Sequence, residues 1–401
     1  MKILILNSGS SSQKSSLYDI EGPLPARPPS PVWEARIEWD GRTAEIQVKA
    51  QKGATFHSRV KIDSRHQALE QMFRSLWESD VRAVEKPSEI HVVGHRIVHG
   101  GRRFEEPVII TAEVKRAIAS ASAFAPLHNR VELEGIAIIE ELLGTVPQVA
   151  VFDTAFHHSL PFAAAVYPGP YEWLAQGIRR YGFHGINHQY CAERAAQLLG
   201  KPLTSLRLVS CHLGNGCSLA AIDGGRSVDT TMGFTPLDGL MMGTRSGSVD
   251  PSILTYLMRE KRIDAGRVDE ILNNESGLLG ISGVSSDMRK ILEAMNSGND
   301  RAELAFAIFV HRLRSGIGSM VAALGGLDAL IFTAGIGENA AAVREAACAR
   351  FSHLGLTLDA VKNSQSPVDQ DIAERDSSVR VLVIHAEEDW AIARECWTMT
   401  Q

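Results

Sequence analysis

Ionisable side chains stand beside glycines at the ends of several apolar runs. They are Arg96 in GHRIVHGG, His128 in APLHN, Asp153 in VFDTAFHH, His184 in YGFHG and Arg245 in MMGTRSG. Two arginines, a carboxylate and histidines are what a site that transfers a negatively charged group requires. Each residue alone has an ordinary structural interpretation, as a surface charge, a hydrogen-bonded histidine or a turn cap. Together they indicate catalysis on an anion.

Small residues follow three apolar runs, in the segments 7–12 (NSGSSS), 212–216 (HLGNG) and 335–339 (GIGEN). Glycine and serine let backbone N–H groups converge on an anion, and Lys14 adds a positive charge beside the first segment. The third segment is expected to turn into a helix, whose first N–H groups would add further donors. Any one of these segments has a plain alternative as a strand-end turn, but the three together predict phosphate binding.

Two common nucleotide-binding fingerprints are missing. No G-x-x-x-x-G-K-[ST] occurs, and neither GNGCSL nor GIGENA has the third glycine of a dinucleotide-binding turn. A P-loop NTPase and a nicotinamide dehydrogenase are therefore disfavoured. A zinc site at His184 and His188 is disfavoured too, because the pair lacks the glutamate of H-E-x-x-H and Gly185 favours a turn.

The composition is that of a globular protein of two or three domains, with 401 residues, 44% hydrophobic and 22% charged. The formal charge of −6 disfavours a nucleic-acid binder or a polybasic membrane binder. The five cysteines contain no C-x-x-C pair, which disfavours a disulfide framework and favours a reducing, cytoplasmic compartment. No apolar run approaches the ~18 residues of a membrane span, and the run 3–6 is too short for a signal-peptide core.

The elements that must position these residues alternate between strand and helix patterns, which predicts an α/β architecture. Strand patterns cover 2–6, 34–40, 43–50, 90–101 and 146–158; helix patterns cover 66–80, 131–144, 193–200 and 301–326; a strand, a turn and a helix follow one another in 328–347 and in 379–397. Loops are expected at 22–31, which holds five of the sixteen prolines, and at 363–378. The strand-turn-strand plan of 2–19 recurs at 206–225, which predicts two related halves facing one cleft.

Longer motifs point to a family. They are NSGSSSQK, GHRIVHGG, APLHN, VFDTAFH, YGFHGINH, CHLGNGCSL, MGFTPLDGLMMGTRSGSVDP, SGLLGISGVSSDMR, FTAGIGEN and EEDWAIAR. In this order they resemble the acetate kinase family, within the acetate and sugar kinase, Hsp70 and actin superfamily. The resemblance implies an α/β, two-domain actin-like ATPase (ribonuclease H-like) fold, with a five-stranded mixed sheet flanked by helices in each domain. The expected domains are 1–152 with 389–401, and 153–388, the second carrying the nucleotide site and the dimer interface.

The resemblance also implies a reaction, the reversible, direct in-line transfer of the ATP γ-phosphoryl group to acetate, giving acetyl phosphate and ADP. Mg²⁺, or Mn²⁺ in its place, is the implied metal. The implied protein is a cytoplasmic homodimer with no nucleic-acid or membrane partner. Because acetate is already ionised at pH 7, no strong general base is needed. We therefore expect Asp153 to act mainly by orienting an arginine or a metal-bound water.

Individual roles follow from the same motifs. By resemblance, Asp153 is the proton donor or acceptor, and His184 and Arg245 stabilise the transition state. Arg96 looks like the residue that binds the acetate carboxylate. The acetate pocket is expected from Val98, Leu127, His128, Phe183 and Pro236. The expected nucleotide contacts are Lys14, His212, Leu213, Gly214, Asn215, Gly216, Asp287, Met288, Arg289, Gly335, Ile336, Gly337, Glu338 and Asn339. The expected metal ligands are Asn7 and Glu388, with Glu387 as a rival to Glu388.

Several points stay open at this stage. Met288 stands where the family more often has phenylalanine, which leaves nucleotide selectivity undecided, and RVELEGI follows APLHN in place of a Pro/Asn-rich stretch. A propionate or butyrate kinase is the close alternative, because one methylene is worth only about 1–3 kcal/mol of discrimination. A catalytically silent nucleotide-binding module of the same fold is disfavoured, because none of the expected catalytic residues is replaced.

Overall fold

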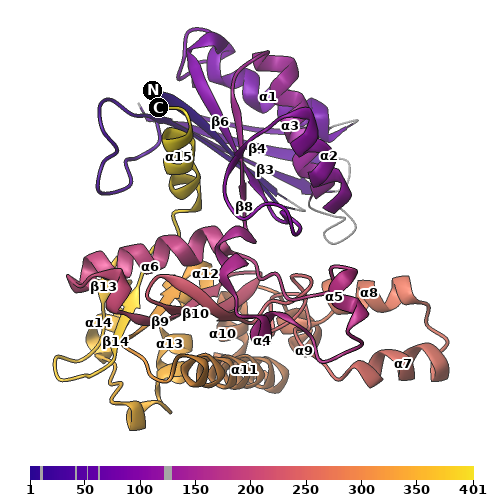
Figure 1. The fold of residues 1–401 in the computed structure, drawn as a ribbon, viewed down its shortest axis with the longest axis vertical. Helices are drawn as coiled ribbons and strands as arrows, with labels where there is room; N and C mark the ends of the chain where they lie inside the picture. The colour runs from indigo at the N-terminus through magenta and orange to yellow at the C-terminus, as the bar shows by residue number, and fades with distance from the viewer. Residues whose placement is uncertain (10–11, 41–42, 52, 62–63, 122–128) are drawn as a thin grey trace. The chain divides into compact units, whose positions relative to one another are not determined.

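The computed structural model describes residues 1–401 except 10–11, 41–42, 52, 62–63 and 122–128. The chain divides into two compact units, Met1–Ala155 together with Glu387–Gln401, and Phe156–Ala386. Asp153 and Glu388, which the sequence expectation placed at the two ends of the second domain, both lie in the first unit. Each unit is an α/β body with its own sheet (Figure 1).

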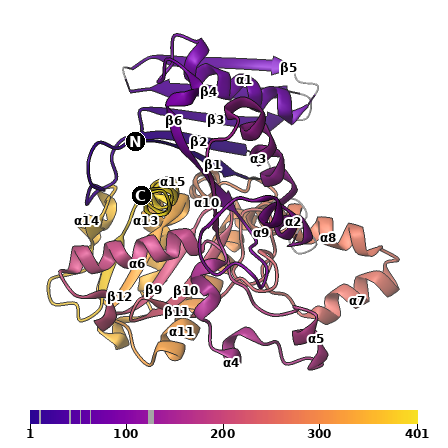
Figure 2. The ribbon, with the colours of Figure 1, turned by 45° about the horizontal axis from the view of Figure 1, so that its top comes forward.

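The sheet of the first unit has eight strands within the described residues, in the order β5-β4-β3-β2-β1-β6-β8-β7. Their bounds are β1 Lys2–Ser8, β2 Ser12–Asp19, β3 Trp33–Asp40, β4 Thr43–Ala50, β5 Thr55–Lys61, β6 Ile90–Ile97, β7 Val108–Ile109 and β8 Gln148–Phe152. Strands β1 to β5 form an antiparallel series (Figure 2). Strands β1, β6 and β8 are parallel. The carboxyl ends of these three parallel strands therefore lie at one edge of the sheet.

This sheet is wider than the expected five strands. The hairpin partner β5 extends the antiparallel series, and the two-residue β7 adds an edge beside β8. The sequence analysis missed β5 because its residues, TFHSRVK, are mostly exposed and show no apolar alternation.

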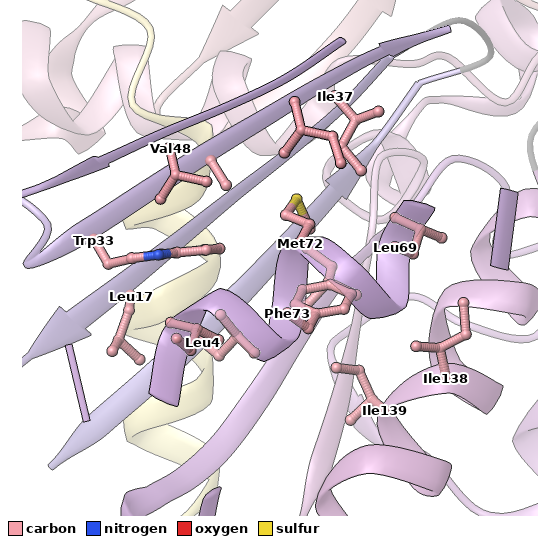
Figure 3. Packing of buried hydrophobic residues seen from close by; sticks show 14 of the residues in the cluster. Leu4, Leu17, Trp33, Ile37, Val48, Leu69, Met72, Phe73, Ile138 and Ile139 are labelled. Atoms are coloured by element: carbon pink, nitrogen blue, oxygen red, sulfur yellow. The ribbon is translucent and has the colours of Figure 1, made fainter. Parts of the chain in front are cut away.

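Helices cover both faces of this sheet. On one face, α1 (Arg65–Glu78) and α3 (Asn129–Leu143) enclose the core, whose members include Leu4, Leu17, Trp33, Ile37, Val48, Leu69, Met72, Phe73, Ile138 and Ile139 (Figure 3). On the other face, α15 (Glu388–Met399) packs against β1 and β6. A Cβ at Gly94 would lie 2.6 Å from Cys396 Sγ and 2.7 Å from Ile392 Cγ2, so glycine permits this close packing. The helix α2 (Ala112–Ala121) packs on α3, and the 3₁₀ turn η1 (Pro87–Glu89) precedes β6.

The sheet of the second unit has six strands within the described residues, in the order β11-β10-β9-β12-β14-β13. Their bounds are β9 Arg207–Leu213, β10 Cys217–Asp223, β11 Arg226–Thr230, β12 Ala329–Thr333, β13 Gln370–Asp371 and β14 Arg380–Val383. Strand β9 pairs antiparallel with β10 and parallel with β12, as β1 does with β2 and β6. This pairing confirms the internal repeat predicted from the sequence.

Two helices cover the faces of this second sheet (Figure 1). The helix α6 (Gly185–Leu199) lies on the face of Ser210 and Ser218, because its His188 hydrogen-bonds both hydroxyls. The helix α11 (Asp300–Leu324) lies on the opposite face, where Gly316 packs against Leu219. The remaining helices are α4 Phe162–Ala165, α5 Glu172–Ala175, α7 Pro251–Glu260, α8 Ala265–Asn274, α9 Gly277–Ser282, α10 Met288–Asn296, α12 Ala334–Asn339, α13 Ala341–Cys348 and α14 Ala360–Ser364, with 3₁₀ turns η2 Ala155–Ser159, η3 Leu203–Ser205 and η4 Ser352–Leu354.

Two local expectations are wrong. The segment 335–339 is not a glycine-rich turn, because β12 passes at Thr333 directly into α12, and Ala334 turns the chain with a φ of 65°. Gly337 instead allows close packing, since a Cβ there would lie 3.3 Å from the Phe332 carbonyl carbon. The segment 363–378 is not all loop, because it holds the end of α14 and the edge strand β13.

Within the described part of the chain, no helix combines the length and the apolar character that a membrane crossing requires.

Candidate active site

The parallel strands of the first unit bring Arg96 and Asp153 together. Arg96 lies near the carboxyl end of β6, and Asp153 directly follows β8. Arg96 Nε donates to both carboxylate oxygens of Asp153 at 3.1 Å, and Nη2 donates to Oδ2 at 2.5 Å. The Asp153 side chain is buried, so this carboxylate is held against the guanidinium away from bulk water. Such a bidentate pair fixes the plane of the guanidinium group.

A second contact directs the other side of Arg96. Its Nη1 donates to Asn7 Oδ1 at 3.0 Å and lies 3.8 Å from Glu388 Oε2. Burial alone would lower the pKa of Arg96, but the negative charges of Asp153 and Glu388 outweigh this effect and raise the pKa above that of a free guanidinium. These contacts use one N–H on each of Nε, Nη1 and Nη2, and a guanidinium carries five. The second N–H of each Nη is thus suited to bind a carboxylate substrate.

Asn7 and Glu388 form an oxygen-rich group beside Arg96. Asn7 Nδ2 donates to Glu388 Oε2 at 3.1 Å and to Asp389 Oδ1 at 3.0 Å. Glu387 is the N-cap of α15 and Glu388 its first residue, so both stand where the chain re-enters the first unit. Mg²⁺ prefers carboxylate and amide oxygens, and it usually keeps waters and phosphate oxygens as further ligands. The described residues hold no cluster of three or more acidic, histidine or cysteine side chains for a closed cage. The donor set fits Mg²⁺ in this open form.

The other predicted residues of the first unit are Lys14 and Val98. Lys14 is exposed on β2 and faces Asn7 in the strand register. Val98 is buried just after β6, and its N–H donates to Glu132 Oε1 at 3.1 Å. Leu127 and His128 lie outside the described residues.

Glu132, on α3, is a buried carboxyl group that the sequence analysis did not predict as part of the site. Burial raises the pKa of Glu132 from 4.5 to about 8, against the opposing effects of the Val98 N–H and the charge of Arg96. Its Oε2 has no hydrogen-bond partner among the described residues. No sequence signal distinguished it, because a glutamate in a helical pattern is usually exposed.

In the second unit, His184 and Arg245 bracket Gly216. A Cβ at Gly216 would lie 3.4 Å from His184 Nε2 and 3.5 Å from Arg245 Nη1. His184 has a φ of 58° and is the N-cap of α6, so the chain turns sharply there and presents the ring at the end of the sheet. A glycine between an imidazole and a guanidinium leaves room for a small anion to reach both.

Arg245 is a half-buried cation whose contacts are with uncharged groups. Its Nη1 donates to the Pro236 carbonyl at 3.2 Å and lies 3.8 Å from Met242 Sδ. Among the described residues, no carboxylate forms an ion pair with Arg245. Partial burial lowers the pKa of the Arg245 guanidinium. Its charge is thus poorly compensated and suited to an anionic ligand.

Histidines and serines surround His184 on this face of the sheet. The rings of His184 and His212 stack with centroids 4.0 Å apart. His184 Nδ1 lies 2.9 Å from Ser218 Oγ, and His188 Nε2 lies 2.8 Å from the same oxygen. Burial lowers the pKa of His188 well below 6.5. In the sequence, His188 stands out only as a disfavoured zinc ligand, and no motif marks Ser218. The alternation S-C-H in β9 and C-S-L in β10 nevertheless places polar groups on one face.

The predicted nucleotide segments lie at the same end of this sheet or near it. The turn 212–216 joins β9 and β10, and Asn187 Nδ2 bonds His212 Nδ1 at 2.8 Å. Asn215 packs so closely on Gly243 that a Cβ there would lie 2.0 Å from Asn215 Oδ1. In α12, Glu338 accepts the Ala386 N–H at 3.0 Å and pairs with His385, and Asn339 Nδ2 donates to Gly335 O.

The segment 287–289 begins α10. Asp287 caps the helix by accepting the Arg289 N–H at 2.9 Å, and its carboxylate pairs with the Arg289 guanidinium. Arg289 is 82% exposed, whereas Met288 is buried. Phe183 is also buried, and Pro236 is half-buried beside Arg245.

The paired mixed sheets, with the repeated hairpin and helices on both faces, define a two-domain actin-like ATPase fold. Full-length similarity narrows this class. The chain is 60% identical over 400 residues to the acetate kinase of a Nostoc species, covering 99% of each chain. Its structure is similar to that of Porphyromonas gingivalis acetate kinase, with a TM-score of 0.91, 37% identity and all of both chains covered. It is also similar to a propionate kinase from Francisella tularensis, with a TM-score of 0.90, 37% identity and 99% of each chain covered.

The sequence model of the acetokinase family matches residues 2–394. The chain belongs to this family and is thus a phosphotransferase with a carboxyl group as acceptor, with ATP and ADP as its nucleotide substrates.

Proposed function

We propose that this protein is an acetate kinase, which reversibly transfers the γ-phosphoryl group of ATP to acetate and forms acetyl phosphate and ADP. The observation that carries the site assignment is a pair of arginines with hydrogen-bonding capacity left for an anion. Arg96 keeps two N–H groups beyond its contacts with Asp153 and Asn7, and Arg245 lies beside Gly216 with a carbonyl and a sulfur as neighbours. Both substrates are anions, so their approach requires these charges.

The residues of the first unit are proposed to bind the acceptor. Acetate is ionised at neutral pH, so it can attack without giving up a proton. Arg96 would bind its carboxylate in a bidentate manner, and Asp153 would hold the guanidinium in place. Val98 would contact the methyl group. Leu127 is proposed as a second methyl contact and His128 as a further acetate contact, and Phe183 and Pro236 of the second unit are also proposed for the methyl pocket.

The residues of the second unit are proposed to act on the phosphoryl group. His184 and Arg245 would donate hydrogen bonds to its oxygens as charge builds on them. An arginine in this position is worth about 10³–10⁵ in rate in related phosphoryl transfers. The segments 212–216, 287–289 and 335–339, with Lys14, would contact the nucleotide.

We propose Asn7 and Glu388 as the residues that hold Mg²⁺, with Glu387 as the rival. When bound, this ion supplies charge neutralisation for the phosphate oxygens. Mn²⁺ has the same preference for oxygen ligands and is proposed as a substitute.

A homodimer in the cytoplasm is the proposed state of the protein. Large apolar side chains that include Val249, Ile253, Tyr256 and Met258 are exposed on the second unit, which supports it as the dimer surface. The five cysteines are buried thiols, which supports a reducing compartment.

The test is acyl phosphate formation from ATP and Mg²⁺ with acetate, propionate or butyrate, trapped with hydroxylamine. We expect the highest kcat/KM with acetate. A higher value with propionate or butyrate would assign the protein to the alternative kinases, a class that the Francisella relative represents. No product from any acid, with ATP still bound, would leave only the silent nucleotide-binding module. Arg96→Gln and Arg245→Gln should each lose activity, whereas Arg36→Gln, at an exposed ion pair, is the matched control.

A further inference from the structure

We propose that Ser218 is a positioning residue for His184, and that it sets which ring nitrogen of His184 carries the proton. This inference rests on the proposed role of His184 in phosphoryl transfer. Ser218 touches neither substrate in this proposal. It acts by holding Nδ1 of His184, so that Nε2–H is the donor that faces the transferred group.

The geometry confines the His184 ring on two sides. Its Nδ1 lies 2.9 Å from Ser218 Oγ, and its face stacks on His212 at 4.0 Å between centroids with an interplanar angle of 13°. The opposite nitrogen, Nε2, is the atom that lies 3.4 Å from the Cβ position of Gly216. One edge of the ring is therefore anchored inside the protein while the other faces the glycine and Arg245.

The Ser218 hydroxyl is shared between two imidazoles. Its Oγ lies 2.9 Å from His184 Nδ1 and 2.8 Å from His188 Nε2. A hydroxyl has one proton to donate, so it can donate to only one of these nitrogens. The other ring must then donate its own N–H to the oxygen if both hydrogen bonds form. The proton positions of the two histidines are coupled through this one oxygen.

His188 extends this chain of hydrogen bonds to a fourth side chain, Ser210. Its Nδ1 lies 2.9 Å from Ser210 Oγ, and all three of Ser210, Ser218 and His188 are fully buried. Burial lowers the pKa of His188 well below 6.5, so at neutral pH the ring is uncharged and carries one N–H. The hydrogen bonds along this series can all be donated in one direction or all in the reverse direction. Each of these two orientations fixes the proton on a defined nitrogen of each neutral ring.

Only one orientation makes a neutral His184 a donor at Nε2. In it, Ser210 O–H donates to His188 Nδ1, His188 Nε2–H donates to Ser218 Oγ, and Ser218 O–H donates to His184 Nδ1. The reverse orientation places the proton of a neutral His184 on Nδ1 and leaves a lone pair at Nε2. A lone pair would repel a phosphoryl oxygen, whereas an N–H would stabilise it. We infer that the first orientation is the functional one.

The experiment compares Ser218→Ala with the wild type by steady-state kinetics and by ¹⁵N NMR of ring-labelled histidine. The His184 signals are assigned by their loss in His184→Gln. In the wild type we expect the Nε2–H form of His184. In Ser218→Ala we expect a shift toward a mixture of tautomers. We also expect kcat to fall about 10- to 100-fold, with KM for ATP and for acetate within threefold, a smaller loss than the about 10²–10³ for removal of a donor itself.

Two further variants separate this role from a structural one. Ser227→Ala is the matched control, because Ser227 is as buried as Ser218 and its hydroxyl hydrogen-bonds a different histidine, at His157 Nδ1, at 2.7 Å. It should leave the His184 tautomer and kcat unchanged. Ser218→Thr keeps the hydroxyl and should retain both the wild-type tautomer and most of the activity, and it serves if Ser218→Ala does not fold.

The outcomes are distinct. An unchanged His184 tautomer in Ser218→Ala, or a rise in KM with kcat unchanged, would overturn the role of Ser218. A wild-type protein that forms no acyl phosphate would instead overturn the proposed function. The tautomer measurement would still report on the hydrogen bond from Ser218 in that case.

Discussion

At the scale of single residues, the candidate site is a set of ionisable side chains that are buried or partly buried. Arg96 is held by a buried aspartate, Arg245 has no carboxylate neighbour among its described contacts, and Glu132 is a buried acid. Burial of a charge is costly unless a partner compensates it. The contacts of each of these groups therefore indicate its role, and a substitution at that residue tests it.

The ion pair between Asp153 and Arg96 predicts that Asp153 acts through orientation. In Asp153→Asn, the side chain has no charge and only one acceptor oxygen, so the bidentate pair is lost and the plane of the Arg96 guanidinium is held less firmly. We expect KM for acetate to rise at least about tenfold, kcat to fall less, and KM for ATP to change little. Steady-state kinetics with each substrate varied measures this split.

Asp19→Asn is the matched control in the same unit, because Asp19 pairs with Lys2 at a partly exposed position. A large loss of kcat with KM for acetate unchanged would contradict the orienting role. It would indicate that the charge of Asp153 acts in the transition state.

Glu132 predicts a pH dependence of stability. Its pKa is about 8 in the folded protein against 4.5 for the free group, so between these values the folded state holds a proton that the unfolded chain has released. The free energy of unfolding contributed by this group therefore falls as pH rises through that window, by at most about 1.4 kcal/mol per pH unit. Glu132→Gln removes this contribution, so its stability relative to wild type should increase between pH 5 and pH 8.

Urea denaturation at several pH values measures the difference. Glu141→Gln, on the exposed side of the same helix, is the control. Parallel pH curves for wild type and Glu132→Gln would show that Glu132 titrates normally.

At the scale of elements, strand ends and helix starts position the site. The β9–β10 turn holds Gly216, the start of α6 holds His184 in the left-handed region, and α12 follows β12 without a loop. Each of these junctions is short, so the side chains at them have little freedom. The site geometry follows from where these elements stop rather than from their lengths.

Gly216→Ala tests the space between His184 and Arg245. The added methyl would lie 3.4 Å from His184 Nε2 and 3.5 Å from Arg245 Nη1, a distance that the fold can accept. It would fill the position proposed for a phosphoryl oxygen, so we expect a folded protein whose kcat falls about 10²–10³-fold. Activity and thermal unfolding measured on the same sample separate the two effects.

Gly318→Ala on α11 is the control, because a Cβ there meets no atom within 4 Å. It should keep wild-type activity and gain about 0.5–1 kcal/mol of helix stability. If Gly216→Ala keeps activity within threefold, the anion does not occupy this space.

At the scale of the whole molecule, the chain leaves the first unit after Ala155 and returns to it at Glu387. The returning helix α15 buries Trp390, Ile392 and Cys396 against the sheet. It also carries Glu388 beside Arg96. Completion of the first unit and completion of the proposed metal group therefore depend on the same fifteen-residue segment, 387–401.

Gly94→Ala tests this packing in the full chain. A Cβ there would lie 2.6 Å from Cys396 Sγ, 2.7 Å from Ile392 Cγ2 and 2.9 Å from Ile5 Cδ1, so something must move. We expect a loss of roughly 1–3 kcal/mol of stability from overpacking. Hydrogen exchange should show the loss in β1, β6 and α15.

Cys396→Ala removes the nearest of these atoms, so the double variant should recover part of the loss. The coupling energy of this double-mutant cycle is the measurement. Strict additivity would show that Gly94 does not meet Cys396 in solution.

By itself the sequence determined the α/β class, the positions of most strands and of the longest helices, the repeated hairpin and the family. These depend on local patterns, because hydrophobic period, glycine turns and long motifs are written in consecutive residues. The tertiary structure decided that Arg96 pairs with Asp153, that Ser218 lies between two histidines, and that Glu132 is buried. The structure also shows a helix at 335–339, where the sequence predicted a glycine-rich turn. Arg96 and Asp153 are 57 positions apart, and His184 and Ser218 are 34 apart. Such pairings, and the pKa shifts that burial causes, arise only when strands and helices pack, because no short-range pattern records which side chains will share one sheet edge.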